Sequence, residues 1–275
     1  MKANVIVHGA ITKDPRFPGN DPDDKKYKRK LLAEGDSWFS MGSIPVENLL
    51  LALEFETPAI VVNIAEPGDE IVKMADPRRV KLFQRLVGPG QFAYSWTAIL
   101  LSGGGNDLID QAPDILRSGN TVAACINQTQ LRQCMSSIAG AYRALAAIRD
   151  QSTKNAQCPM IVHTYDFPTP RNAPALFFGH KIVGPWLYDD FVAKAIPEAL
   201  WNPITDQLID TLATTIMGLA SGAKAIPGFH VIDTRKTIVR AEPGTKKKSG
   251  DWRNEIHPDR GGYKKLAAKL RAAIP

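Results

Sequence analysis

The sequence predicts an α/β fold in which a parallel sheet of about five strands lies between two layers of helices. Two patterns favour this fold. Short apolar runs such as 59–65 and 98–101 show no polar alternation, which is typical of strands covered by helices on both faces. Between these runs apolar residues recur with helical spacing, and strands that alternate with helices form parallel sheets. The chain has 275 residues, of which 44% are hydrophobic, so it can bury such a core in one domain.

The first 30 residues are interpreted as an N-terminal arm ahead of a single domain at 31–275. The arm combines an edge strand at 4–7 with a polar loop at 15–24 that is rich in proline, glycine and aspartate. The strands expected in the domain cover residues 31–33, 59–65, 98–101, 160–164 and 229–233. The expected helices cover residues 45–54, 70–74, 77–87, 121–152, 204–221 and 259–273. We expect a break near Gly140 in the longest helix and a stop at Gly222 after the helix at 204–221.

The proline-spaced segment at 168–203 is expected to form a long functional loop or lid with short helices. It contains several aromatic residues, among them Trp186, Tyr188 and Trp201. These side chains either line a hydrophobic pocket or pack the loop against the core, and the sequence favours neither interpretation.

Composition narrows the class of protein. The sequence has no run of roughly 18 apolar residues and starts without the apolar stretch of a secretory signal. We therefore expect a cytoplasmic protein with no membrane span. Three cysteines without a CxxC motif fit reduced thiols. Part of the net charge of +6 comes from basic runs at 25–30 and 246–248, which are typical of solvated loops. Without interleaved aromatic residues, nucleic-acid binding is a minor alternative.

Residues with catalytic chemistry follow the predicted strands. Ser37 follows the first strand, Gly68 the second and Asn106 the third, and His257 lies beyond the fifth. The carboxyl ends of parallel strands meet at one edge of a sheet, so these residues are expected to come together there. In this arrangement the sequence resembles the GDSL or SGNH family of serine hydrolases and esterases. The blocks that carry the resemblance are Gly35-Asp36-Ser37, Gly68, Gly104-Gly105-Asn106-Asp107 and His257-Pro258.

The resemblance spans about 31–273 and implies a three-layer, flavodoxin-like α/β/α sandwich of the SGNH hydrolase type. It also implies that Ser37 is the nucleophile and that His257 is the general base, since a serine hydroxyl needs such a base to attack. The implied oxyanion hole consists of the backbone N–H groups of Ser37 and Gly68 and the side-chain amide of Asn106. Asp36 and Asp107 are interpreted as structural residues that hold their turns.

One position departs from the family pattern. The family usually has an aspartate three residues before the histidine, and this sequence has Asn254 there. Three interpretations follow: Asp251 or Glu255 replaces the carboxylate, Asn254 orients a working dyad, or the protein is a weak or retired hydrolase. Among these we favour Asp251, because the loop can curl it back towards His257. His163 and Asp166, after the fourth strand, either line the site or pack a loop.

The resemblance thus implies hydrolysis of a small-molecule or lipid-like carboxylic ester through an acyl-enzyme, without metal or organic cofactor. No spacing of histidines or carboxylates indicates a metal site. Acyl transfer to another alcohol, or removal of acetyl groups from a polysaccharide, would use the same residues. A non-catalytic binding protein on the same scaffold is the alternative from another class, because fold does not imply function. The sequence does not indicate the oligomeric state.

Overall fold

The computed structural model describes residues 1–14, 16–40, 47–177 and 180–275, and a parallel sheet of six strands lies at its centre. The strand order is β1-β3-β2-β4-β5-β8, and every neighbouring pair is parallel. The strands are β1 (Asn4–Val7), β2 (Arg29–Gly35), β3 (Ala59–Asn63), β4 (Ala98–Ser102), β5 (Met160–His163) and β8 (Phe229–Ile232). The predicted parallel sheet is confirmed, and the edge strand expected at 4–7 is its sixth member.

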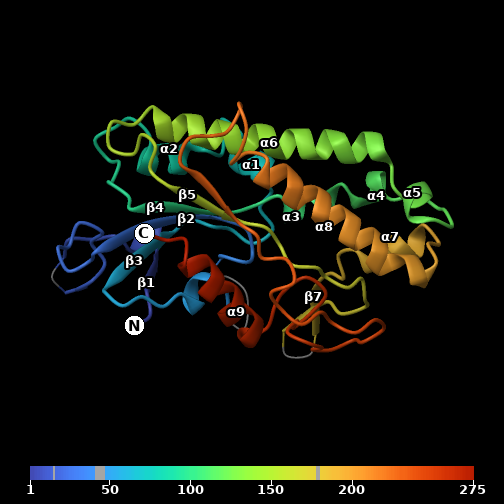
Figure 1. The fold of residues 1–275 in the computed structure, drawn as a ribbon. Coiled ribbons are helices and arrows are strands. Elements are labelled where there is room, and N and C mark those ends of the chain that lie inside the picture. The colour runs from blue at the N-terminus through green and yellow to red at the C-terminus, as the bar shows by residue number, and fades with distance from the viewer. Residues whose placement is uncertain (15, 41–46, 178–179) are drawn as a thin grey trace.

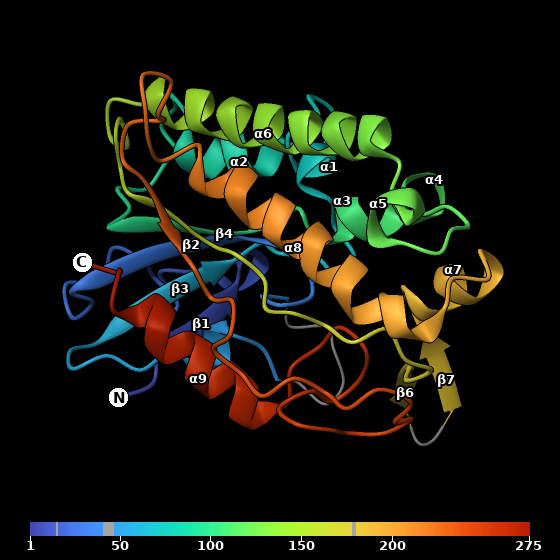
Figure 2. The same ribbon diagram turned by 45° about the vertical axis from the view of Figure 1, so that its right-hand side comes forward.

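Helices cover both faces of this sheet. The main ones are α1 (Ile71–Met74), α2 (Lys81–Val87), α6 (Gln128–Asp150), α8 (Trp201–Met217) and α9 (Arg260–Arg271). The first four lie on one side of the sheet and α9 lies on the other (Figures 1 and 2). All residues of β3 and β4 are buried, which explains why these strands are apolar without alternation. The three-layer α/β/α architecture is therefore confirmed.

Shorter elements fill the connections. The remaining α-helices are α3 (Gly105–Asp110), α4 (Ala112–Ile115), α5 (Val122–Cys125) and α7 (Tyr188–Ala193). Single 3₁₀ turns lie at η1 (His8–Ala10), η2 (Leu50–Ala52) and η3 (Glu198–Leu200). The segment at 168–203 also contains an antiparallel hairpin, β6 (Ala175–Phe177) and β7 (His180–Val183), which the sequence did not predict.

The longest predicted helix, 121–152, breaks at a different place from the one expected. It is divided at 126–127 into α5 and α6, and α6 runs through Gly140 without interruption. The break follows from Asn127, whose side-chain oxygen accepts hydrogen bonds from the backbone N–H groups of Thr129 and Gln130 at 3.3 and 3.4 Å. Such a cap satisfies the free N–H groups at a helix start. A glycine inside a helix costs some stability but does not force a break.

Two further helix predictions need correction. The expected helix at 45–54 contains only the 3₁₀ turn η2, and residues 45 and 46 lie outside the described residues. The Asn48 side chain donates to Ser40 O at 2.8 Å and accepts from Leu51 N at 2.9 Å, so it replaces the regular helical ladder with local contacts. The helix expected at 204–221 is α8, which begins three residues earlier and ends before Gly218 rather than Gly222.

The sheet topology brings the ends of three adjacent strands together. Gly35 at the end of β2 pairs with Ser102 at the end of β4, and His163 ends β5 on the other side of β4. The segments that follow these strands therefore share one edge of the sheet. No helix in the described part of the chain is both long and apolar enough to cross a membrane. The single-domain assignment and the cytoplasmic location stay predictions.

Candidate active site

Ser37 and His257 meet at this edge although 220 residues separate them. Ser37 follows β2, and His257 lies in the loop that precedes α9. The distance from His257 Nε2 to Ser37 Oγ is 2.8 Å. This is the reach that a general base needs to take the proton of a serine hydroxyl.

The turn at residues 35–40, called here the Ser37 turn, is held by Asp36. The Asp36 carboxylate accepts a hydrogen bond from Trp38 N at 3.0 Å, and its backbone oxygen accepts from Phe39 N and Ser40 N. Gly35 is needed at the start of the turn, because a Cβ there would lie 2.6 Å from the carbonyl oxygen of Ser102. The turn is thereby fixed against the end of β4.

The loop at residues 251–258, called here the His257 loop, is anchored from three sides. Trp38 Nε1 donates to Ile256 O at 3.2 Å and so ties this loop to the Ser37 turn. The buried Arg171 donates to Asn254 O at 2.6 Å. The rings of Trp186 and His257 pack in a T-shaped arrangement, with centroids 5.2 Å apart. These contacts hold His257 in position next to Ser37.

Asn254 is the residue that contacts the second nitrogen of the imidazole. His257 Nδ1 lies 3.0 Å from Asn254 Oδ1, and the same oxygen accepts from His257 N at 2.8 Å and Ile256 N at 3.2 Å. An amide nitrogen could not accept from these two backbone donors, so the oxygen must face them. Nδ1 therefore carries the hydrogen, and the lone pair of Nε2 points towards Ser37.

The two carboxylates considered as replacements bind elsewhere. Asp251 Oδ2 accepts from Val239 N at 2.7 Å and from the Lys265 ammonium at 2.6 Å. Glu255 is buried and accepts from the backbone N–H groups of residues 186–188 and of Arg171. The structure does not bring Asp251 to His257, because backbone and lysine contacts bind its carboxylate on the side of α9.

The side chain of Asn106 lines the same pocket as Ser37. Its amide donates to Asp69 O at 3.1 Å. The neighbouring Asp107 accepts from the backbone N–H groups of Ile71 and Val72 at the start of α1, which fixes α3 against α1. Gly68 lies in the exposed turn after β3 with φ +81°, a conformation that favours glycine. The oxyanion hole that combines Ser37, Gly68 and Asn106 stays a prediction.

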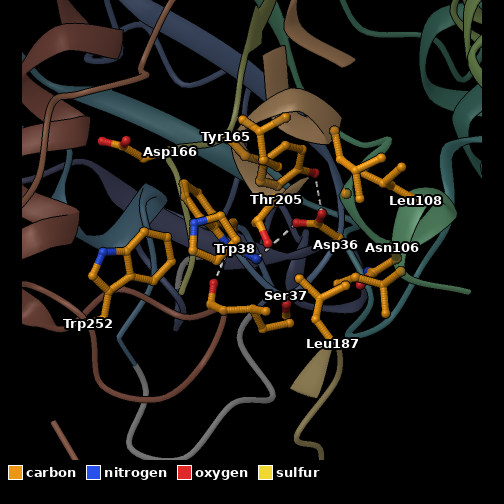
Figure 3. Close-up of a pocket in the computed structure, with 16 residues that line it drawn as sticks. Asp36, Ser37, Trp38, Asn106, Leu108, Tyr165, Asp166, Leu187, Thr205 and Trp252 are labelled. Carbon is orange, nitrogen blue, oxygen red and sulfur yellow. Dashed lines mark hydrogen bonds between the residues drawn. The ribbon is translucent and has the colours of Figure 1, made fainter. Parts of the chain in front are cut away.

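An apolar pocket opens beside Ser37 (Figure 3). In this view Leu187 lies beside Ser37, and Leu108 lies above Asn106. The cavity has a volume of about 40 Å³ and is partly open to solvent. Its aliphatic lining includes residues of α3 and α8, the residue before α7 and one residue of the His257 loop: Leu108, Ile109, Leu208, Ile209, Leu187 and Ile256.

The fold is similar to that of a solved lipase. An extracellular lipase from Streptomyces rimosus aligns with a TM-score of 0.53 and 14% identity, over 89% of this chain and 99% of the lipase. The chain has the SGNH hydrolase fold. A catalytic mutant of an acetylxylan esterase from Geobacillus stearothermophilus aligns with a TM-score of 0.48 and 14% identity, over 90% of this chain and 94% of the esterase. A phospholipase A1 from Streptomyces albidoflavus has a TM-score of 0.46 and 13% identity, with 89% and 98% covered. No protein-family model and no curated protein matches the sequence.

Within this SGNH fold, His163 and Asp166, the other two residues expected to line the site or pack a loop, lie in different places. His163 is fully buried beneath the Ser37 turn, where its ring stacks on Trp38. Asp166 borders the pocket, but its carboxylate accepts from the backbone N–H groups of residues 236–238. In the segment at 168–203, Trp186 contacts His257, whereas Tyr188 and Phe191 pack against Trp201. The segment thus both borders the site and packs onto itself.

Three residues that support the candidate site were missed in the sequence analysis. Arg171 anchors the His257 loop, and Ser102 and Tyr165 contact the Asp36 carboxylate. The positions of Ser102 and Tyr165 carried one signal, since each directly follows a predicted strand, 98–101 or 160–164. Arg171 had none, because its partners lie more than 70 residues away. In the described part of the chain, no group of three His, Cys, Asp or Glu side chains is placed to hold a metal ion.

The pH dependence of this site is set by His257. Burial of the imidazole, with the nearby positive charge of Arg253, lowers the pKa of His257 to about 4. The free base therefore persists well below neutral pH. We expect kcat/KM for an ester to stay constant down to about pH 5 and to fall below about pH 4, since kcat/KM reports the ionisation of the free enzyme.

A pH profile of kcat/KM checks this expectation. Arg253→Gln is the matched variant, because it removes the positive charge and should move the acidic limb to higher pH. Fluorescence recorded over the same range identifies any loss caused by acid unfolding. An acidic limb near pH 6.5, the ordinary value for histidine, would contradict the assignment.

Proposed function

We propose that the protein is a serine esterase that hydrolyses carboxylic esters through an acyl-enzyme on Ser37. One observation carries the proposal: Ser37 Oγ, the imidazole of His257 and Asn254 Oδ1 form a continuous chain, with contacts of 2.8 and 3.0 Å. The fold shared with a lipase supports the same class of reaction.

In the proposed reaction His257 takes the hydroxyl proton as Ser37 Oγ attacks the acyl carbon of the ester. The N–H groups of Ser37 and Gly68 and the Asn106 amide stabilise the negative charge on the carbonyl oxygen by hydrogen bonds. His257 then gives its proton to the leaving alkoxide, which departs as the alcohol. Water then attacks the acyl-enzyme, and His257 again takes a proton and returns it to Ser37 Oγ. This step releases the carboxylic acid and free Ser37.

Labelling with a fluorophosphonate probe tests the proposal. An activated serine displaces fluoride from the probe and forms one phosphonyl adduct. We expect the native protein to gain the mass of a single adduct and Ser37→Ala to gain none. No adduct under conditions that label a known esterase would overturn the proposal and favour a non-catalytic binding protein.

The pocket beside Ser37 favours esters with an apolar acyl chain. Each buried methylene stabilises binding by about 0.8 kcal/mol, which corresponds to about fourfold in affinity. The p-nitrophenyl butyrate and hexanoate esters should therefore have higher kcat/KM than the acetate. A deacetylase acting on carbohydrate would show the reverse order.

A substitution in the pocket wall tests which residues accommodate the chain. Ile109→Trp fills part of the pocket at a partly exposed position and should lower kcat/KM for hexanoate by about tenfold while sparing acetate. Val192→Trp on α7 is the matched control, because Val192 is exposed outside the pocket. Equal losses for both esters would show that the chain does not enter this pocket.

A further inference from the structure

Polar side chains at the ends of three adjacent strands form a buried array beneath the Ser37 turn. Asp36 follows β2, Ser102 ends β4 and His163 ends β5. None of the three is more than 2% exposed. Ser102 Oγ lies 2.7 Å from Asp36 Oδ1 and 2.9 Å from His163 Nε2, so the serine bridges the other two residues. Tyr165 donates to the other oxygen of Asp36, a contact drawn in Figure 3.

The hydrogen positions in this array follow from the surrounding acceptors. His163 Nδ1 lies 2.9 Å from the carbonyl oxygen of Thr164, which can only accept, so Nδ1 carries a hydrogen. Nε2 then presents a lone pair to Ser102 if the ring is neutral, and a hydrogen if the ring is doubly protonated. Ser102 Oγ also lies 3.4 Å from the Tyr165 hydroxyl, whose hydrogen is donated to Asp36. For its two closer partners, Asp36 and His163, Ser102 has only one hydroxyl hydrogen.

Both contacts of Ser102 can be hydrogen bonds only if Asp36 and His163 together hold one extra proton. With this proton on Asp36, the acid donates to Ser102 Oγ and the serine donates to His163 Nε2. With the proton on His163, Nε2 donates to Ser102 and the serine donates to the carboxylate. Without it, one contact places two lone pairs face to face, which is costly in a buried site.

We propose that Asp36, Ser102 and His163 share this one proton, and that Ser102 and His163 are positioning residues for Ser37. The second part rests on the esterase function proposed above. The link to the reacting groups is direct. Asp36 holds the Trp38 N–H, and the Trp38 ring stacks on His163 with centroids 5.3 Å apart. The same indole donates to the residue before His257, so the array supports both sides of the catalytic pair.

Burial places the shared proton on Asp36. It raises the pKa of Asp36 to about 6 and lowers the pKa of His163 to about 4, so both side chains favour their neutral forms. Three buried tyrosines lie close to Asp36: Tyr165 after β5, Tyr142 on α6 and Tyr263 on α9. Burial raises the pKa of each tyrosine, so all three stay neutral while the array titrates.

Nuclear magnetic resonance of the full chain tests the shared proton without any substrate. At about pH 5 an ordinary aspartate is ionised, whereas Asp36 and His163 should both be mainly neutral. We expect the Asp36 carboxyl carbon to report the acid form and His163 to report a neutral ring with hydrogen on Nδ1. A doubly protonated His163 beside ionised Asp36 would also support a shared proton. Ionised Asp36 beside neutral His163 would overturn it, whether or not the protein is an esterase. Asp36→Asn and His163→Gln assign the signals.

Kinetics of Ser102 variants test the positioning role. Ser102→Ala should lower kcat for p-nitrophenyl butyrate by about tenfold with little change in KM, and Ser102→Thr, which keeps the hydroxyl, should restore most of the rate. Ser40→Ala is the matched control, because Ser40 is equally buried but its hydroxyl has no partner among the described residues. Equal losses in Ser102→Ala and Ser40→Ala, or no rescue by threonine, would overturn the positioning role.

Discussion

Ser37→Ala is expected to lower kcat/KM for ester hydrolysis by at least about 10⁴-fold. The substitution removes the oxygen that His257 contacts at 2.8 Å, so no acyl-enzyme can form. The residual rate would come from substrate binding and from stabilisation of the oxyanion alone. Steady-state kinetics with p-nitrophenyl butyrate measures the effect.

The fold of this variant should be unchanged. Ser37 is only partly buried, and the Ser37 turn is held by Asp36 and by backbone contacts that the substitution keeps. Circular dichroism and thermal melting check this point. Ser118→Ala is the matched control. The Ser118 hydroxyl donates to Lys194 O, and Ser118 does not line the pocket beside Ser37, so its loss should not affect turnover. Turnover retained in Ser37→Ala would contradict the role of Ser37.

The sheet could be predicted from the sequence because its strands are buried on both faces. Residues 31–33 have no exposed surface, and such strands need apolar side chains at every position. The helix predictions were wrong where one polar side chain replaces the backbone ladder, as Asn48 and Asn127 do. Apolar periodicity does not register such local competition.

The residues of the site could be predicted to the extent that their motifs are local. Ser37 and His257 each lie in a short block at the end of a predicted strand or before a helix, and the structure brings them into contact. The contact of Asn254 with the imidazole was one of three interpretations of the sequence, which favoured Asp251 instead. It depends on Arg171 and on the attraction of Asp251 to Lys265, both contacts with segments outside the His257 loop.

The array of Asp36, Ser102 and His163 was out of reach of the sequence for a similar reason. His163 was predicted near the active edge, but a histidine that lines a site and one that is buried below it give the same local pattern. The pairing of β4 with β2 and β5 decides between them, because it places Ser102 within hydrogen-bond distance of both other residues.

Asn254→Asp is expected to raise kcat/KM about tenfold, and Asn254→Ala to lower it by about 10²-fold. An aspartate can accept the same three hydrogen bonds as Asn254 Oδ1, from His257 Nδ1 and from two backbone N–H groups. Its charge would also stabilise the imidazolium that forms as Ser37 attacks, since charge-assisted hydrogen bonds are about twice as strong as neutral ones. Alanine would leave the ring free to rotate and to adopt the other tautomer.

The pH profile separates this electrostatic effect from a change in structure. A carboxylate next to His257 raises the pKa of the imidazole, typically by about 1–3 units for such pairs. The acidic limb of kcat/KM should therefore lie at higher pH in Asn254→Asp than in the native protein. Asp251→Asn is the matched control, because Asp251 contacts Val239 and Lys265 instead of the ring, and its kcat/KM should stay within about threefold. If Asp251→Asn lost activity while both Asn254 variants kept it, the role of Asn254 would be contradicted. The result would indicate a rearranged loop in which Asp251 orients His257.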